Sequence, residues 1–380
     1  MIAAVLVLLA LSGAQELPRG QITADVKCAA DPSQSYAVYL PARYTPDRPW
    51  PVILAFDPGG RGRVPVERYQ AAAEQYGFIV AGSNTSRNGS PGTKPVIAMT
   101  EDVQARFTVD PKRVYTAGMS GGARVALWAA LASQGIAGVI ASSAGYPDGK
   151  PRKSLTFPIF ATAGTEDFNH LEMRQLDEAL TSPHHLAIFE GGHVWLSSDL
   201  AVEAVEWMEV QAMKAARKPR DEQEIDRIFS KRVAAARGSP TDKDRLLALR
   251  SIASDFEGLR EVTSLSAQVA ELGRDKRVRE ALKKDRDEDG WEQRMLDDIR
   301  SMEMRLASEE TRQDTLTDLR NRWKDLADRA AKPEDSADRR LARRVLGGLS
   351  ASVITTDRDY LAIIGQYRMG RGRRGGNLPE

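Results

Sequence analysis

A serine flanked by glycines, Gly118-x-Ser120-x-Gly122, constrains the fold of this chain more than any other stretch. The apolar residues 114–117 before it predict a buried strand, and residues 123–132 after it have the spacing of a helix. In such a strand–turn–helix junction the serine has a strained backbone, and its hydroxyl is exposed at the end of the sheet. Side chains at the two glycine positions would collide with the neighbouring strand and helix. The pattern predicts that Ser120 is a nucleophile, although a plain glycine-rich turn has the same pattern.

Short apolar runs alternate with helical patterns through the first half of the chain. Continuous apolar runs are typical of strands that are buried on both faces of a parallel sheet. Strands separated by helices predict a doubly wound, mostly parallel sheet, and so an α/β fold class. The expected strands are residues 34–40, 51–56, 77–81, 114–117, 138–142, 158–163 and 186–190, and the expected helices are residues 66–76, 95–106, 123–133, 171–180 and 200–213.

Candidate partners for Ser120 follow two of the later strands. Asp167 comes after the strand at residues 158–163, and His193 comes after the strand at residues 186–190. Sites in doubly wound sheets form at the carboxyl ends of the strands, so these loops are expected beside Ser120. His193 would take the serine proton as general base, and Asp167 would orient the imidazole and stabilise its charged form.

Few other residues can take these two roles, because the chain has only four histidines. His184 and His185 precede the last strand and are therefore expected at the wrong end of the sheet. His170 is the remaining alternative base, although it is close in sequence to the acid. Glu166 is the rival acid, but Asp167 has the expected place after the strand.

The glycine pair Gly59-Gly60 follows the strand at residues 51–56 and is the candidate oxyanion loop. Glycine allows backbone N–H groups to approach a developing oxyanion, and the N–H of Gly121 is the second expected donor. A plain turn that opens a helix is the alternative explanation of this stretch.

Three side chains are candidates for the substrate pocket. Met119 is next to the serine, Arg87 lies in the loop after residues 77–81, and Trp195 is two residues past the candidate base. Trp195 would either stack on an acyl or sugar group or pack against the last helix. Arg87 would either bind an acid group of the substrate or remain a solvated loop arginine.

Five stretches carry a resemblance to a known family: LAFDPGGRG, GSNTSRNG, VYTAGMSGGARVA, FATAGTEDFNH and FEGGHVW. They resemble α/β-hydrolases of the polyhydroxybutyrate depolymerase and feruloyl esterase lineage, over about residues 35–213. The resemblance implies Ser120, Asp167 and His193 as nucleophile, acid and base. Relatives often carry His-Gly-Gly at the oxyanion turn, where this chain has Asp-Pro before the two glycines.

The chain changes character after the predicted hydrolase domain, residues 15–217. Residues 218–366 are charged, with apolar stripes at helical spacing, and predict a smaller all-α domain of helical hairpins or a short solenoid. The acidic run at residues 285–290 begins like a calcium loop but has Leu296 where a glutamate is needed, so a solvated acidic turn is expected. Further helices are expected at residues 291–306, 311–330 and 338–349.

The two ends of the chain are predicted from composition. Residues 1–14 combine a short apolar run with small residues before the expected cleavage point, which predicts a signal peptide and a secreted or periplasmic protein. Residues 367–380 form a basic Gly/Arg tail, for which disorder is a better explanation than nucleic-acid binding. Cys28 is the only cysteine, which excludes an internal disulfide or a Cys-based zinc site and is expected to be buried.

These patterns together predict a serine esterase that acts on a small-molecule or polymeric ester. The chemistry needs no cofactor or metal. Lys and Arg (54) balance Asp and Glu (53), so no global charge points to nucleic acid or a membrane surface, and no membrane span is expected. The helical domain would pack beside the hydrolase or bind a protein partner. A serine peptidase and a binding protein with a relic hydrolase domain are the alternatives.

Overall fold

The computed structural model describes residues 17–89, 92–353 and 356–369. The predicted signal peptide and most of the Gly/Arg tail lie outside the described residues, so both interpretations stay predictions.

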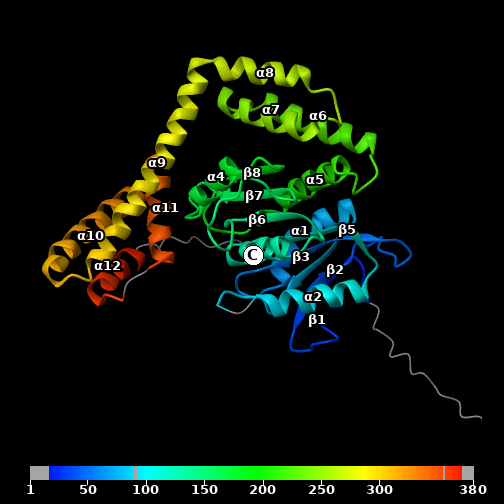
Figure 1. The fold of residues 1–380 in the computed structure, drawn as a ribbon, viewed down its shortest axis with the longest axis horizontal. Coiled ribbons are helices and arrows are strands. Elements are labelled where there is room, and N and C mark those ends of the chain that lie inside the picture. The colour runs from blue at the N-terminus through cyan, green and yellow to red at the C-terminus, as the bar shows by residue number, and fades with distance from the viewer. Residues whose placement is uncertain (1–16, 90–91, 354–355, 370–380) are drawn as a thin grey trace, which may run out of the picture.

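An eight-stranded sheet lies at the centre of the first half of the chain (Figure 1). Its strands are β1 (Ile22–Lys27), β2 (Ser35–Tyr39), β3 (Trp50–Phe56), β4 (Ile79–Ser83), β5 (Val109–Met119), β6 (Ile136–Ser142), β7 (Ile159–Gly164) and β8 (His184–Phe189). They follow the order β1-β2-β4-β3-β5-β6-β7-β8, and only the pairs β1–β2 and β2–β4 are antiparallel. This strand order is that of the α/β-hydrolase fold, which confirms the predicted fold class.

Helices cover both faces of the sheet because its central strands are apolar on both sides. Every residue of β3, β4, β6 and β7 is buried. One apolar cluster lies between the sheet and the helices α2 (Thr93–Arg106), α3 (Gly121–Ala132) and α4 (His170–Ala179). A second cluster lies between the opposite face and the helices α1 (Arg63–Tyr76) and α5 (Ser198–Lys214). The sheet is thus a middle layer whose strand ends present loops to one edge.

The first half differs from expectation in several places, of which three concern β1, the end of α1 and the start of β8. β1 was not expected, because this edge strand is partly exposed and polar and lacks a continuous apolar run. The strand expected at residues 77–81 begins at Ile79, since Gly77 ends α1 in the left-handed region with φ 74°. His184 and His185 are the first residues of β8 rather than residues that precede it.

The second half is all helical, as expected. Its helices are α6 (Glu222–Arg237), α7 (Asp242–Phe256), α8 (Thr263–Arg274), α9 (Lys276–Arg305), α10 (Glu309–Ala330), α11 (Ala337–Ala351) and α12 (Arg358–Met369). The end of α5 packs with α6, α7 and α8 around one apolar cluster, and the second part of α9 packs with α10, α11 and α12 around another. In Figure 1, α9 runs along the side of the molecule from the first cluster to the second.

Two expectations for the helical half are wrong. The acidic run at residues 285–290 lies inside α9 and is not a turn, and Asp285 and Asp289 form ion pairs with Lys243 and Arg174. The helix expected from residue 291 begins at Lys276. Its first half was missed because it is highly charged and presents few apolar side chains. α12 was not expected at all.

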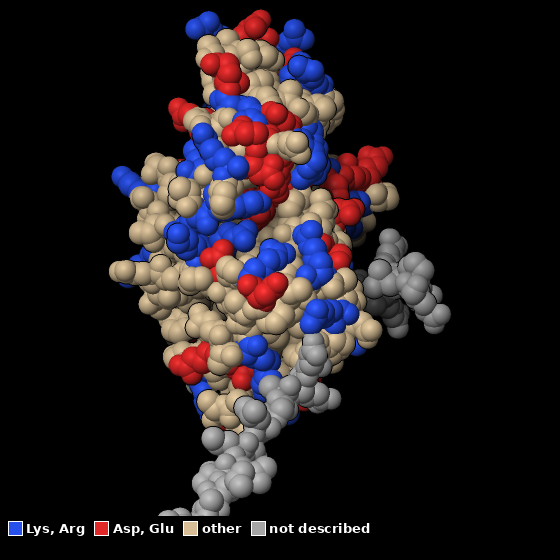
Figure 2. Space-filling view, turned by 90° about the vertical axis from the view of Figure 1, so that its right-hand side faces the viewer, with Lys and Arg blue, Asp and Glu red and all other residues tan. Residues whose placement is uncertain are grey.

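The surface shows no concentration of one charge in the view of Figure 2. Lysine, arginine, aspartate and glutamate side chains are interspersed over this face. Among the described residues, no helix is both long and apolar enough to cross a membrane. Cys28 is buried, and burial raises the pKa of its thiol to about 11, so it is a weak nucleophile at neutral pH.

Backbone packs directly on backbone where β4 meets the start of α1. A methyl group added to Gly82 would come within 2.1 Å of the carbonyl oxygen of Gly62, and one added to Gly62 would come within 2.0 Å of the carbonyl oxygen of Gly82. Neither contact involves a side chain that can move away. This contact sets the distance between β4 and the loop that follows β3.

We expect Gly82→Ala to lower the free energy of unfolding by about 1–3 kcal/mol or more, because the new methyl group forces the two backbones apart. Urea denaturation followed by circular dichroism measures the effect. Gly273→Ala is the matched control, since a methyl group there meets nothing within 4 Å and lies in a helix. The control should keep or gain stability; equal losses in both variants would contradict the prediction.

Candidate active site

Ser120 lies at the sharp turn between β5 and α3, with φ 54° and ψ −123°. A non-glycine residue rarely adopts such a positive φ, and the strain is held by the packing around the turn. A methyl group on Gly118 would come within 2.1 Å of the Gly122 carbonyl oxygen, and one on Gly122 within 1.9 Å of the Phe56 carbonyl oxygen. The N–H of Ser120 donates to the carbonyl of Ser142 on β6 at 2.8 Å. The turn therefore has the geometry that the sequence predicts.

The structure brings Ser120, His193 and Asp167 into one hydrogen-bonded line. His193 Nε2 is 2.8 Å from Ser120 Oγ, and His193 Nδ1 is 2.8 Å from Asp167 Oδ1. Asp167 is fully buried, whereas Ser120 is partly exposed and the His193 side chain is 19% exposed. A carboxylate that accepts from Nδ1 leaves Nε2 to accept the serine proton. This arrangement can activate Ser120 as a nucleophile.

The acid loop, residues 165–168, and the base loop, residues 190–195, follow β7 and β8 and are joined to each other. The N–H of Thr165 donates to Phe189 O at 2.9 Å, and the N–H of Glu166 donates to Gly191 O at 2.8 Å. The ring of Phe168 stacks on that of His193, with centroids 3.9 Å apart and planes at 27°. The imidazole is thus held at one nitrogen by Asp167 and on one face by Phe168.

The rival residues face elsewhere. His170 Nδ1 lies 3.0 Å from the carbonyl of Gly164, and burial, with the nearby charge of Arg344, lowers the pKa of His170 to about 4. Burial also lowers the pKa of His185 to about 3, and its ring stacks on Phe160. Glu166 forms ion pairs with arginines of α11 and does not contact His193 through any described hydrogen bond.

The glycines of the candidate oxyanion loop use their N–H groups within the loop. Gly59 donates to Asp57 Oδ1 at 2.8 Å, and Gly60 donates to Asp57 O at 3.1 Å. This differs from the expected role of both residues, because neither N–H is free for an oxyanion in this conformation. Gly121 is the first residue of α3, where the helix provides no acceptor for its N–H. Its N–H therefore stays the expected oxyanion donor at this turn.

Asp57 organises this loop, a role that was not predicted from the sequence. Its buried carboxylate accepts from Gly59, from Arg61 Nε at 2.9 Å and from Trp195 Nε1 at 2.8 Å. Burial by itself would raise the pKa of Asp57, but the hydrogen bonds from Arg61, Trp195 and Gly59 outweigh burial and lower it. An aspartate directly after an apolar strand was the available signal.

The three candidate pocket residues differ in burial and in what they contact. Trp195 is buried in the apolar cluster that includes α5, and its indole N–H is used by Asp57, so it does not offer a face for stacking on substrate. Met119 is buried in the same cluster. Arg87 is exposed, and its backbone bridges to that of Gly59, which agrees with a solvated loop arginine.

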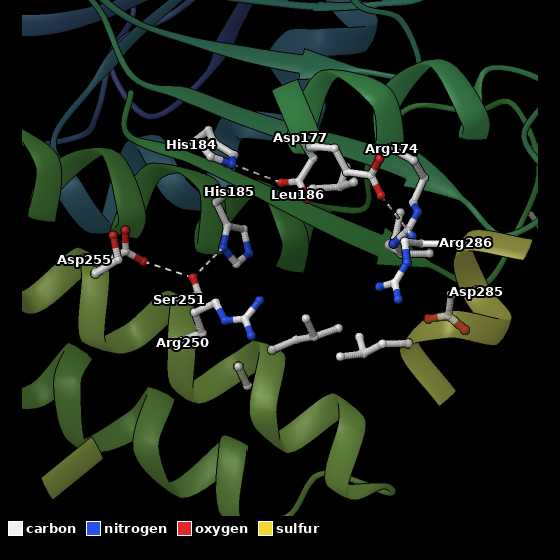
Figure 3. Close-up of a pocket in the computed structure, with 16 residues that line it drawn as sticks. Arg174, Asp177, His184, His185, Leu186, Arg250, Ser251, Asp255, Asp285 and Arg286 are labelled. Atoms are coloured by element: carbon white, nitrogen blue, oxygen red, sulfur yellow. Dashed lines mark hydrogen bonds and ion pairs between the residues drawn. The ribbon is translucent and has the colours of Figure 1, made fainter. Parts of the chain in front are cut away.

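A cavity of about 650 Å³ lies away from the triad, between β8 and α4 on one side and α7 and α9 on the other (Figure 3). Its lining includes His184 and His185 at the start of β8, and the guanidinium groups of Arg250 and Arg286 extend toward it. None of the three aligned residues lines it. The cavity runs along the edge strand β8, from His184 to Ile188, and is separate from the candidate active site.

The strand order defines the class of this protein, an α/β-hydrolase fold, and its strand ends bring Ser120, His193 and Asp167 together. No protein-family model and no curated protein matches the chain at a significant level.

Solved structures with similar chains include esterases. Est1E from Butyrivibrio proteoclasticus is 15% identical, with a TM-score of 0.40, and the match covers 50% of this chain and 99% of that one. The esterase domain of a Rhodothermus marinus protein is 14% identical, with a TM-score of 0.40, over 51% and 98% of the two chains. Dipeptidyl peptidase 4 from Porphyromonas gingivalis is 16% identical, with a TM-score of 0.37, over 50% and 35%. Likenesses this distant say nothing of activity, and the fold rests on the strand order.

We expect Asp57→Asn to lower the free energy of unfolding by about 1–3 kcal/mol near neutral pH, because buried donors lose a charged acceptor. The folded-state pKa of Asp57 is lowered, so its carboxylate stabilises the fold above the pKa of an unfolded aspartate, about 3.9. That contribution is lost as the pH falls through the folded-state pKa. The gap between wild type and variant should therefore narrow in acid, as urea denaturation at several pH values will measure.

Asp148→Asn is the control for this measurement. Asp148 also pairs with an arginine, Arg152, but its side chain is 41% exposed. An exposed pair contributes little, so this variant should lose much less stability than Asp57→Asn. Equal losses, or a gap for Asp57→Asn that does not change with pH, would contradict the role of the buried carboxylate.

Proposed function

We propose that this protein is a serine hydrolase that cleaves a carboxylic ester through an acyl-enzyme on Ser120. The observation that carries the proposal is the line of two 2.8 Å hydrogen bonds from Ser120 through His193 to Asp167. The buried carboxylate holds the imidazole with Nε2 toward the serine, which is the arrangement that a general base requires.

In the proposed reaction, His193 Nε2 takes the proton of Ser120 as Oγ attacks the carbonyl carbon of the ester. The tetrahedral intermediate carries its negative charge near the N–H of Gly121 and the N-terminus of α3, which stabilise it. Collapse breaks the ester bond, and the alcohol leaves with the proton from His193. Water then gives a proton to His193 and attacks the acyl carbon, and His193 returns that proton to Ser120 Oγ as the bond to the acyl group breaks and the acid is released.

The second oxyanion donor would come from the loop after β3. The N–H of Gly59 is the candidate, and recruiting it requires its 2.8 Å hydrogen bond to Asp57 Oδ1 to break. Arg61 and Trp195 would continue to satisfy that carboxylate when the glycine turns away. The Asp57 carboxylate would therefore keep two hydrogen-bond donors after the N–H of Gly59 turns toward the oxyanion.

The partial exposure of Ser120 and His193 favours catalysis over the relic alternative, in which the nucleophile would be covered. The proposed substrate is a small-molecule or polymeric ester. Comparing ester with peptide substrates of matched acyl groups distinguishes an esterase from a peptidase.

The proposal also includes a leader at residues 1–14 with export, and a helical half that contacts the hydrolase.

We expect Ser120→Ala to lower the turnover of a short-chain chromogenic ester by about 10⁴-fold or more while the protein stays folded. The substitution removes only the hydroxyl that forms the acyl-enzyme. A fluorophosphonate probe, mapped by mass spectrometry, should label the wild-type protein at Ser120 and leave Ser120→Ala unlabelled.

Ser143→Ala is the matched control, because Ser143 also has a positive φ, 60°, and a hydroxyl hydrogen-bonded near the site. It should retain labelling at Ser120. Unchanged ester hydrolysis by Ser120→Ala, or no fluorophosphonate adduct on the folded wild-type protein, would contradict the proposed function.

A further inference from the structure

Helix α11 presents a row of arginines to the loops that carry the candidate acid and base. The four arginines are Arg339, Arg340, Arg343 and Arg344, and each is within ion-pair or hydrogen-bond distance of the acid loop or the base loop. Figure 1 shows α11 on the side of α9 that faces the sheet domain. The residues in contact are more than 140 positions apart in the sequence, so these contacts belong to the tertiary fold.

Glu166 is the centre of this contact. Arg343 Nη1 donates to both carboxylate oxygens of Glu166 at 2.8 Å, and Arg339 Nη2 donates to Oε1 at 3.2 Å. The Glu166 side chain is 21% exposed and that of Arg339 is 16% exposed, so water screens these bonds only partly. Glu166 is bonded through its peptide to Asp167, and α11 therefore holds the residue next to the acid.

Arg344 holds the same loop from a buried position. Its Nη1 donates to the carbonyl of Thr165 at 2.9 Å, and its Nε donates to Glu292 Oε2 of α9 at 2.8 Å. The side chains of Arg344 and Glu292 are 8% and 1% exposed. Burial raises the pKa of Glu292, and the charge of Arg344 offsets this only in part. A buried pair of this kind is costly to break, so it fixes α9, α11 and the acid loop to one another.

α11 also reaches the loop on the other side of Asp167. A methyl group added to Gly348 would lie 3.9 Å from both Cβ and the carbonyl oxygen of Phe168, so this turn of α11 packs against that residue. Phe168 in turn stacks on His193. The helix therefore bonds to residues 165 and 166 and lies next to residue 168, on both sides of the acid.

We propose that α11 positions the catalytic acid Asp167 by holding the residues beside it, with Arg343 as the principal positioning residue. The helical half would then be needed for the full activity of the site. The inference rests on the proposed function, because it gives the Asp167–His193 hydrogen bond a catalytic purpose. A loop that carries an acid must hold its carboxylate at hydrogen-bond distance from the imidazole, which is 2.8 Å here. A misplacement of 1 Å costs about 100-fold in rate.

The test compares Arg343→Ala with wild type. We expect kcat for the chromogenic ester to fall about 10- to 100-fold with little change in KM, because the loop is displaced but the substrate contacts remain. Arg343→Lys should restore kcat only in part, since lysine keeps the charge but loses the second contact of the guanidinium, from Nε to the carbonyl of Ala330 at 3.0 Å. Glu166→Gln should resemble Arg343→Ala, and the double variant should be no worse than either single one.

A readout independent of turnover separates positioning from stability. The proton shared by His193 and Asp167 gives a far-downfield NMR resonance when the bond is short and protected. It should broaden or move upfield in Arg343→Ala, while the circular dichroism spectrum and Tm stay close to wild type. Arg322→Ala is the matched control, because Arg322 forms an exposed ion pair with Asp298 in the same helical cluster at 3.2 Å and should leave kcat and the resonance unchanged.

Each outcome decides one question. Wild-type kcat and an unshifted resonance in Arg343→Ala would overturn the positioning role, as would equal losses in Arg322→Ala, which would indicate general destabilisation. If Ser120→Ala keeps full ester hydrolysis, the proposed function fails, whereas a resonance shift confined to Arg343→Ala would still show that α11 holds the acid loop.

Discussion

The structure depends on a contact between two pieces of backbone. Where β5 turns into α3, Gly122 lies so close to the end of β3 that a methyl group would come within 1.9 Å of the Phe56 carbonyl oxygen. The turn at Ser120 can be this sharp only because nothing occupies that space. The same closeness brings the end of β3, with Asp57, beside the serine, and Asp57 then bonds Trp195 of the base loop. The distance between β3 and β5, the sharp turn at Ser120 and the position of Asp57 all depend on the missing side chain at Gly122.

The sheet was predictable because its strands are buried on both faces, which leaves continuous apolar runs that few other structures produce. The order of Ser120, Asp167 and His193 at successive strand ends placed three distant residues at one edge without any coordinates. β1 and the first half of α9 escaped prediction for the opposite reason. An exposed edge strand and a largely solvated helix need few apolar residues, so their sequences resemble loops and charged turns.

Sequence patterns also failed to say what individual side chains face. Glu166 and Asp167 are chemically alike and adjacent, and only the structure shows that one meets His193 and the other meets Arg343. Trp195 packs in the apolar cluster with α5, which is one of the two expected places, but the hydrogen bond from its indole N–H to Asp57 on another loop was not predicted. The N–H of Gly59 is occupied because the residue before the Pro-Gly turn is an aspartate whose side chain accepts it, and the N–H of Gly60 bonds to the backbone carbonyl of the same residue. Such pairings depend on contacts across the chain, which periodicity does not encode.

The distance along the chain between the acid loop and α11 has a consequence for how the molecule is made. During synthesis, Ser120, Asp167 and His193 leave the ribosome well before the residues of α11 exist, since Arg343 follows Glu166 by 177 positions. Domains fold as they emerge, so the sheet can assemble around an acid loop that still lacks its outer support. The order of synthesis thus allows two steps: the sheet can form first, and, under the proposed positioning role, the Asp167–His193 hydrogen bond reaches its final geometry only once α11 has packed against the acid loop.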